Sequence, residues 1–155
     1  MKFGLFRTEE AEGALLAHAV NTGERRFSKA HRLTAEDIAY LRSAGIEEVS
    51  AALLDADDLD EDAAAARIAS ALLFENVEKR PPATGRVNLH ATEAGIFTVD
   101  RHLINAINGV DPAITIATLE ANAQVDAGRM VATVKIIPFA VPEHLVAQVE
   151  TICRG

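Results

Sequence analysis

Residues 129–141, RMVATVKIIPFAV, form the stretch on which we base the fold prediction. Valine, isoleucine and threonine at this density indicate a β-strand with at least one buried face. Lys135 is an isolated charge inside this run, which ends near Pro138. Lysine and proline discourage intermolecular pairing, so both residues could protect a sheet edge. The alternative is that the Lys135 ammonium binds an anion on the exposed face of the strand.

The segments on either side of this stretch predict its immediate neighbours in the fold. Residues 113–119 read as a strand, and the polar connection 122–128 would let them pair with 129–141 as an antiparallel ribbon. A helix is predicted over 142–153, because Pro142 suits a first helical turn and the apolar residues that follow have helical spacing.

An alternating pattern further towards the N-terminus predicts a hairpin over residues 86–99. Apolar residues at 87, 89 and 91 alternate with polar ones, and Gly95 marks a turn into a second strand. The polar face is either solvated, as in any antiparallel sheet, or a site for an oxyanion. Its candidate ligands are Thr84, Arg86, Asn88 and His90.

The N-terminal half contains a basic segment in an otherwise acidic protein. Residues 25–33, RRFSKAHRL, include Lys29, His31 and Arg32. Such a segment is either a solvated loop or a site for an anionic ligand or acidic partner. A helix is then predicted over 35–44, with Thr34 as its N-cap and Gly45 at its end, followed by a strand.

The acidic run 55–62 precedes an alanine-rich helix predicted over 61–74. It lacks the glycine and glutamate spacing of an EF-hand, so we interpret Asp60 as a helix cap. Pro81 and Pro82 indicate a boundary between an N-terminal lobe, 1–80, and a C-terminal lobe, 84–155. A short helix is expected from Asp100. Strands and about four helices without a strict repeat predict an α+β fold, with a mixed or antiparallel sheet or two small lobes.

The overall composition excludes several classes of function. The chain has 155 residues, a net charge of −8, one tyrosine and no tryptophan, which argues against a nucleic-acid surface. Nothing resembles a signal peptide or a membrane span, and the single cysteine suits a reducing cytoplasm. The five histidines lack the spacing of metal ligands, so we expect no metal site. No recognisable nucleophile and base are present, so we do not predict an enzyme.

Five segments taken together are similar to a known family. They are EAEGALLAHAV, KAHRLTAEDIAYLRSAGIEEV, DEDAAAARIASAL, TGRVNLHATEAGIF and MVATVKIIPFAV. In this order they resemble the molybdopterin-binding family, specifically the N-terminal accessory region found ahead of a molybdopterin-binding or nucleotidyltransferase-like domain. The segment LTAEDIAYLRSAGIEEV is also similar, more weakly, to molybdopterin molybdotransferases.

This resemblance implies an accessory module of molybdenum-cofactor synthesis or handling. The module would bind the phosphate of molybdopterin, because arginine and lysine clusters suit phosphate. The expected ligands are Lys29, His31, Arg32, Thr84, Arg86, Asn88 and Lys135. The alternative is an interaction module that docks a catalytic domain of the same pathway or a second copy, and binds no small molecule.

Overall fold

The computed structural model describes residues 1–155 and divides the chain into two compact units, Met1–Asp58 and Leu59–Gly155. Each unit has its own buried core. The elements are helices and small antiparallel sheets, which confirms the predicted α+β class. None of the helices combines the length and the apolar character needed to cross a membrane.

The first unit is built on a three-stranded antiparallel sheet in the order β1-β5-β2. Its other elements are a 3₁₀ turn, a small β3–β4 pair and one helix, α1. The bounds are β1 Lys2–Arg7, η1 Thr8–Glu10, β2 Leu15–Leu16, β3 Val20–Asn21, β4 Arg26–Phe27, α1 Ala35–Ser43 and β5 Glu48–Leu53. The predicted helix 35–44 is confirmed as α1, and Thr34 caps it by accepting from the amide of Asp37 at 3.2 Å.

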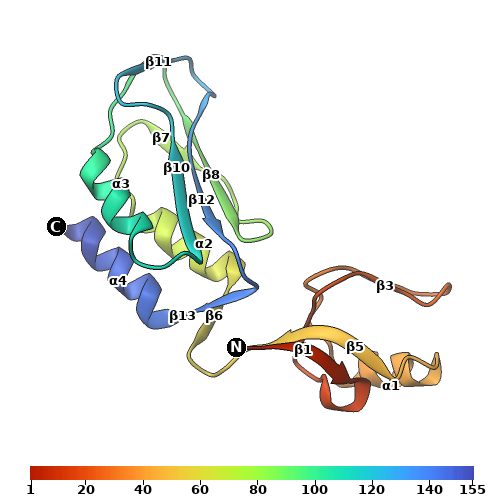
Figure 1. Ribbon diagram of the computed structural model, residues 1–155. Helices are drawn as coiled ribbons and strands as arrows, with labels where there is room; N and C mark the ends of the chain where they lie inside the picture. Colours follow the sequence, from red (N-terminus) through yellow and green to blue (C-terminus); the bar gives the residue numbers. More distant parts are fainter. The chain divides into compact units, whose positions relative to one another are not determined.

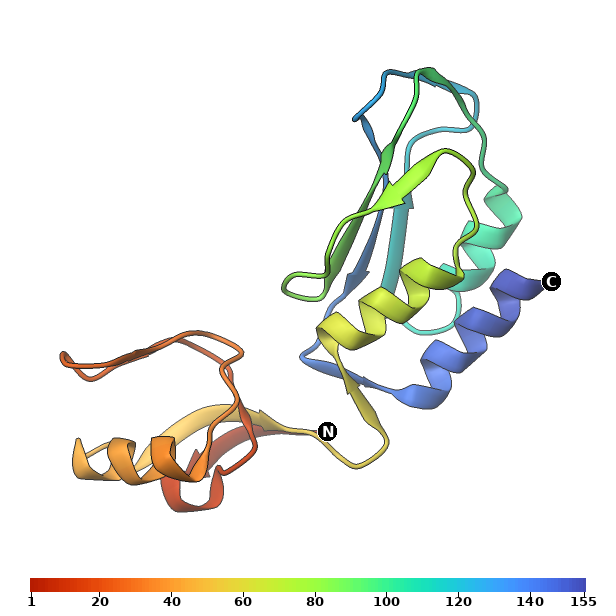
Figure 2. The ribbon, with the colours of Figure 1, turned by 180° about the vertical axis from the view of Figure 1, so that it is seen from behind.

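The second unit contains a four-stranded antiparallel sheet in the order β10-β12-β8-β7. Helices α2, α3 and α4 lie together on one side of this sheet in both views (Figures 1 and 2). The strands are β7 Val77–Lys79, β8 Arg86–Ala91, β10 Ile114–Thr118 and β12 Met130–Ile136. The helices are α2 Glu61–Ala71, α3 Arg101–Asn108 and α4 Glu143–Arg154. Helices are therefore predicted correctly near 61–74, from Asp100 and over 142–153.

Two short ribbons complete the second unit. Strand β9, Gly95–Phe97, pairs with β11, Ala123–Val125, at the end of the sheet that is uppermost in Figure 1. Strand β6, Asp58–Asp60, pairs with β13, Ala140–Pro142. The predicted strand 129–141 is therefore two strands, because the chain leaves the sheet after Ile136 and pairs again only at β13.

The predicted lobe boundary at Pro81 and Pro82 is replaced by one after Asp58. The reason is the alanine-rich helix α2, whose buried face packs against β8 and β12. Four small or apolar side chains form this face, namely Ala64, Ala65, Ile68 and Ala69. Since these side chains belong to the core of the second unit, the chain around the two prolines is a loop within that unit.

The predicted hairpin over 86–99 is wrong in its partner. Strand β8 forms its hairpin with the preceding strand, β7, and β9 leaves to pair with β11. The β7–β8 turn is closed by two hydrogen bonds between Ala83 and Arg86. Its central residues, Thr84 and Gly85, have φ of 49° and 70°. Positive φ at both positions is what a type I′ hairpin turn requires, and this signal was missed because threonine rarely adopts it.

Lys135 does not lie on an edge strand. Strand β12 pairs with β10 on one side and with β8 on the other, so it is an interior strand of its sheet. Its predicted antiparallel ribbon with 113–119 is confirmed as the pairing with β10. Because interior strands have no free edge to protect, edge protection cannot explain the lysine.

Candidate functional site

Polar side chains of β8 and β12, together with Thr115 of β10, share the sheet face opposite the helices, which we call the open face. Residues directly opposite each other in an antiparallel pair point to the same face. Lys135 is opposite Arg86, and Thr133 is opposite Asn88. The intervening residues, Val87 and Val134 among them, are buried in the core that the helices cover. The two cations Lys135 and Arg86 are therefore direct cross-strand neighbours.

Local hydrogen bonds orient two of the side chains on the open face. The Lys135 ammonium donates to the backbone carbonyl of Thr84. The hydroxyl of Thr133 donates to Oδ1 of Asn88 at 2.8 Å. Because this bond occupies the amide oxygen, the amide NH₂ of Asn88 is left as a donor. Lys135 likewise keeps two further N–H donors, so the face presents donors from three neighbouring side chains when the exposed Arg86 is included.

The Thr84–Gly85 turn beside Lys135 and Arg86 offers fewer groups to a ligand than its sequence suggests. The backbone N–H of Gly85 donates to Oδ1 of Asp62, at 2.7 Å, in the first turn of α2. It is therefore not directed at a ligand, and Thr84 takes part through its carbonyl, which accepts from Lys135. Asp62 and Thr133, neither of which we predicted as part of the site, support this end of the face. The cross-strand register identifies Thr133, whereas Asp62 is identified only by the position of α2 beside the β7–β8 turn.

His90 lies on the same strand as Arg86 and Asn88 and is half-buried. Its Nδ1 atom is buried and has no hydrogen-bond partner. The alternating pattern of 86–91 correctly predicts that these three side chains project from one face. A change of register between Met130 and Ala132 alters the pairing opposite His90, so its surroundings differ from those of Arg86.

The other predicted site residues, Lys29, His31 and Arg32, lie in the first unit. His31 contacts the carboxylate of Asp37, with 2.8 Å between Nε2 and Oδ2. Arg32 donates to the carbonyl of Gly13 at 2.9 Å, and Lys29 is exposed. His31 and Arg32 therefore have partners within their own unit, where they hold the segment before α1.

Asp37 is the centre of this arrangement, which we call the Asp37 cluster. Asp37 is 2% exposed, and its carboxylate accepts from Arg25 at 3.0 Å and from the Thr34 amide at 3.1 Å, besides contacting His31. The Arg25 guanidinium also lies 4.7 Å from the ring centre of Phe27. Burial opposes ionisation of Asp37, but the hydrogen bonds from His31 and Thr34 outweigh it and lower the pKa of the carboxyl.

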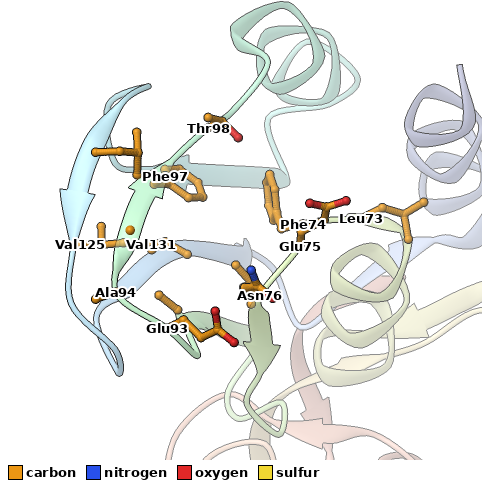
Figure 3. Close-up of a pocket in the computed structure, with 14 residues that line it drawn as sticks. Leu73, Phe74, Glu75, Asn76, Glu93, Ala94, Phe97, Thr98, Val125 and Val131 are labelled. Atoms are coloured by element: carbon orange, nitrogen blue, oxygen red, sulfur yellow. The ribbon is translucent and has the colours of Figure 1, made fainter.

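A cavity of about 470 Å³ lies in the second unit, between the end of α2 and strand β9. The tilted rings of Phe74 and Phe97 pack against each other in its wall, with their centres 5.6 Å apart (Figure 3). We call it the Phe74–Phe97 cavity. Two carboxylates, Glu75 and Glu93, belong to its lining. Sequence reasoning missed this site because its walls come from segments that are separate in the chain and that the β7–β8 and β9–β11 pairings bring together.

Comparison with known proteins adds one similarity. A family model described as a domain of unknown function, DUF8806, matches residues 5–52. The matched stretch lies inside the first unit. No curated protein and no solved structure matches the chain. The comparisons therefore assign no chemistry to the open face or to the Phe74–Phe97 cavity.

Proposed function

We propose that this chain is an accessory module of molybdenum-cofactor synthesis or handling that binds an anionic pterin phosphate, such as molybdopterin, on the open face. The sequence resemblance supports the choice of ligand. The position of Lys135 directly opposite Arg86 supports the choice of site. The proposal uses Lys135, Arg86 and Asn88 of the second unit as ligands, with Thr84 positioning Lys135.

The observation that carries the proposal is the pairing of two like charges. Like charges directly opposite each other on neighbouring strands destabilise a sheet, because their side chains start about 5 Å apart. Since β12 is an interior strand, Lys135 has no role as an edge guard to offset this cost. An anion between the two cations would turn the repulsion into attraction. A phosphate suits both, because arginine donates through a planar fork and lysine acts as a compact charge.

The remaining donors of the open face fit the same ligand. The Asn88 amide lies beside Arg86 on β8, and Thr133 fixes its orientation at 2.8 Å. The open face offers no phenyl or indole ring on which a pterin could stack, so the phosphate would supply most of the affinity. Affinity should then fall as salt rises. We propose a cytoplasmic location, as the single cysteine suggests.

The test is titration calorimetry of the purified chain with molybdopterin and with a pterin that lacks the phosphate. We expect heat only with the phosphate-bearing compound. Arg86→Ala and Lys135→Ala should each weaken binding about tenfold, the size of a lost charge-assisted hydrogen bond. Arg101→Ala removes an exposed charge from helix α3 and serves as the control, with affinity unchanged. The absence of heat with the wild type, or equal losses in all three variants, would overturn the proposal.

An interaction module remains the second candidate. It is favoured by the exposed apolar residues beside the Phe74–Phe97 cavity, Leu73 and Ile96. This candidate concerns a different surface, so it does not depend on phosphate binding.

A further inference from the structure

The Phe74–Phe97 cavity has an apolar floor. Its buried lining residues are Ala91, Phe97, Val125 and Val131, which belong to the main core of the second unit. The hydrogen bond from the Thr92 amide to the Asn76 carbonyl, at 2.8 Å, joins the two chain segments beside it. The floor is thus part of a packed core, and an apolar group that reached it would lose part of its contact with water.

Large apolar side chains also flank the opening of the cavity. Leu73 is 85% exposed and Ile96 is 60% exposed, and both belong to the lining. Figure 3 shows Leu73 on the side of Phe74 that is farther from Phe97. Neighbouring exposed apolar groups around a concave site are typical of an interaction surface. A small molecule inside the cavity would leave Leu73 uncovered, whereas a protein segment crossing it could cover Leu73 and Ile96.

The charge of the lining selects the chemistry of that segment. Glu75 and Glu93 are exposed and lie on opposite sides of Asn76 in the close-up (Figure 3). Neither carboxylate has an ion-pair or hydrogen-bond partner within the chain. No lysine or arginine contributes to the lining. The surroundings of the apolar floor are therefore negative, which complements a basic partner and repels an acidic one.

We propose that the Phe74–Phe97 cavity docks an extended segment of a partner protein that carries an apolar side chain flanked by lysine or arginine. The apolar side chain enters the cavity beside the packed rings of Phe74 and Phe97, and the flanking cations reach Glu75 and Glu93. A second copy of this chain is a poorer occupant, because each copy carries a net charge of −8 and the copies repel one another. The proposal is independent of phosphate binding on the open face.

The experiment uses the full chain and three fluorescein-labelled synthetic peptides of equal length. The basic probe is acetyl-KLKFKLK-amide, the acidic probe replaces each lysine with glutamate, and the neutral probe replaces each with glutamine. Fluorescence anisotropy at low and moderate salt measures their affinity. We expect the basic peptide to bind most tightly, the neutral one more weakly and the acidic one not at all.

Matched variants separate docking in the cavity from general attraction to an acidic protein. The double variant Glu75→Gln/Glu93→Gln should weaken the basic peptide roughly fivefold, as expected for two partly exposed ion pairs. The control double variant Glu12→Gln/Glu120→Gln removes the same charge from exposed sites elsewhere and should change affinity little. Ile96→Ser tests the apolar contact at an exposed position and should weaken the basic and neutral peptides alike.

Three results would overturn the proposal. They are failure of the basic peptide to bind, equal losses in the two double variants, and binding of the acidic peptide as tightly as the basic one. Light scattering adds a fourth outcome. Self-association of the wild type that Glu75→Gln/Glu93→Gln abolishes would assign the cavity to a second copy and reject a separate partner.

Discussion

Gly85 shows at the scale of one residue how the β7–β8 turn is specified. Its φ of 70° favours glycine, and a Cβ atom there would lie 2.7 Å from Oε2 of Glu61 and 2.9 Å from the carbonyl oxygen of Ile136. The first contact involves a side-chain end, but the second involves the backbone of β12. The close approach of three elements therefore requires glycine at this position.

We expect Gly85→Ala to lower the free energy of unfolding of the second unit by about 2–3 kcal/mol. Gly128→Ala is the control, because Gly128 has φ of 82° but no atom near the added Cβ. The control should cost only about 1 kcal/mol, the strain of positive φ alone. Urea unfolding, monitored by hydrogen exchange of the amides in β8 and β12, measures the loss of stability in both variants. Equal costs would show that crowding at Gly85 is unimportant.

The repulsion between Lys135 and Arg86 should lower the stability of the ligand-free protein. Arg86→Gln should raise the free energy of unfolding by a few tenths of a kcal/mol at low salt, because it removes a like charge opposite Lys135. The gain should disappear at high salt, where exposed charges are screened. Arg129→Gln removes an exposed arginine before β12 and should give no such gain. A loss of stability in Arg86→Gln at low salt would contradict the argument for an anion site.

At the scale of the element, the Asp37 cluster fixes the segment that precedes α1. The carboxylate belongs to the capping box of α1 and also receives Arg25 and contacts His31. One buried acid therefore ties the β3–β4 region to the helix. The basic residues of segment 25–33 owe part of their pattern to this internal role, which a linear sequence does not reveal.

Asp37→Asn should destabilise the first unit by about 1–2 kcal/mol, since Arg25 and His31 lose an ionised acceptor but remain partly in water. The single tyrosine, Tyr40, lies in α1, so tyrosine fluorescence reports unfolding of this unit. Glu36→Gln changes the exposed neighbouring acid and serves as the control. If Asp37→Asn unfolds at the same urea concentration as the wild type, the Asp37 cluster contributes nothing to the stability of the first unit.

The lowered pKa of Asp37 also predicts the pH dependence of the first unit. A carboxyl with a lower pKa in the folded state contributes stability that is fully present above its unfolded pKa, about 3.9. That contribution is lost as pH falls through the folded pKa. The wild-type tyrosine transition should therefore weaken below about pH 4, and Asp37→Asn should weaken less over the same range. Identical pH profiles would exclude Asp37 as the titrating group.

At the scale of the whole molecule, two separate cores imply two folding units. The buried residues of the first unit form one cluster, and those of the second unit form another that includes the inward faces of α2, α3 and α4. In the second unit, Arg67 of α2 also donates to Glu150 of α4 at 2.9 Å, which joins the covering helices. Each unit thus contains the contacts that its own elements need.

We expect a fragment of residues 55–155, which keeps all of β6, to fold by itself. Its circular dichroism should show a cooperative urea transition, because its core is complete without the first unit. A fragment of residues 84–155, cut at the boundary predicted from the sequence, should stay unfolded, because it lacks α2. Folding of the shorter fragment, or failure of the longer one, would contradict the division after Asp58.

The helices and the alternating strand were predictable because their causes are local. Thr34 and Asp60 cap α1 and α2, and the alternation in 86–91 places Arg86, Asn88 and His90 on one face. Capping and side-chain periodicity act within a few residues, so the linear sequence contains them. The α+β class follows from the same local signals.

The tertiary structure alone decided which strands became neighbours. It made β12 interior, placed Lys135 opposite Arg86, gave β8 the partner β7, and closed the Phe74–Phe97 cavity with the β9–β11 ribbon. Strand pairing and register depend on contacts between residues far apart in the chain, and on the packing of α2 against the sheet. No periodicity within one strand encodes the identity of its partner, so the sequence by itself determined the elements and their faces, whereas packing decided the sites that they form.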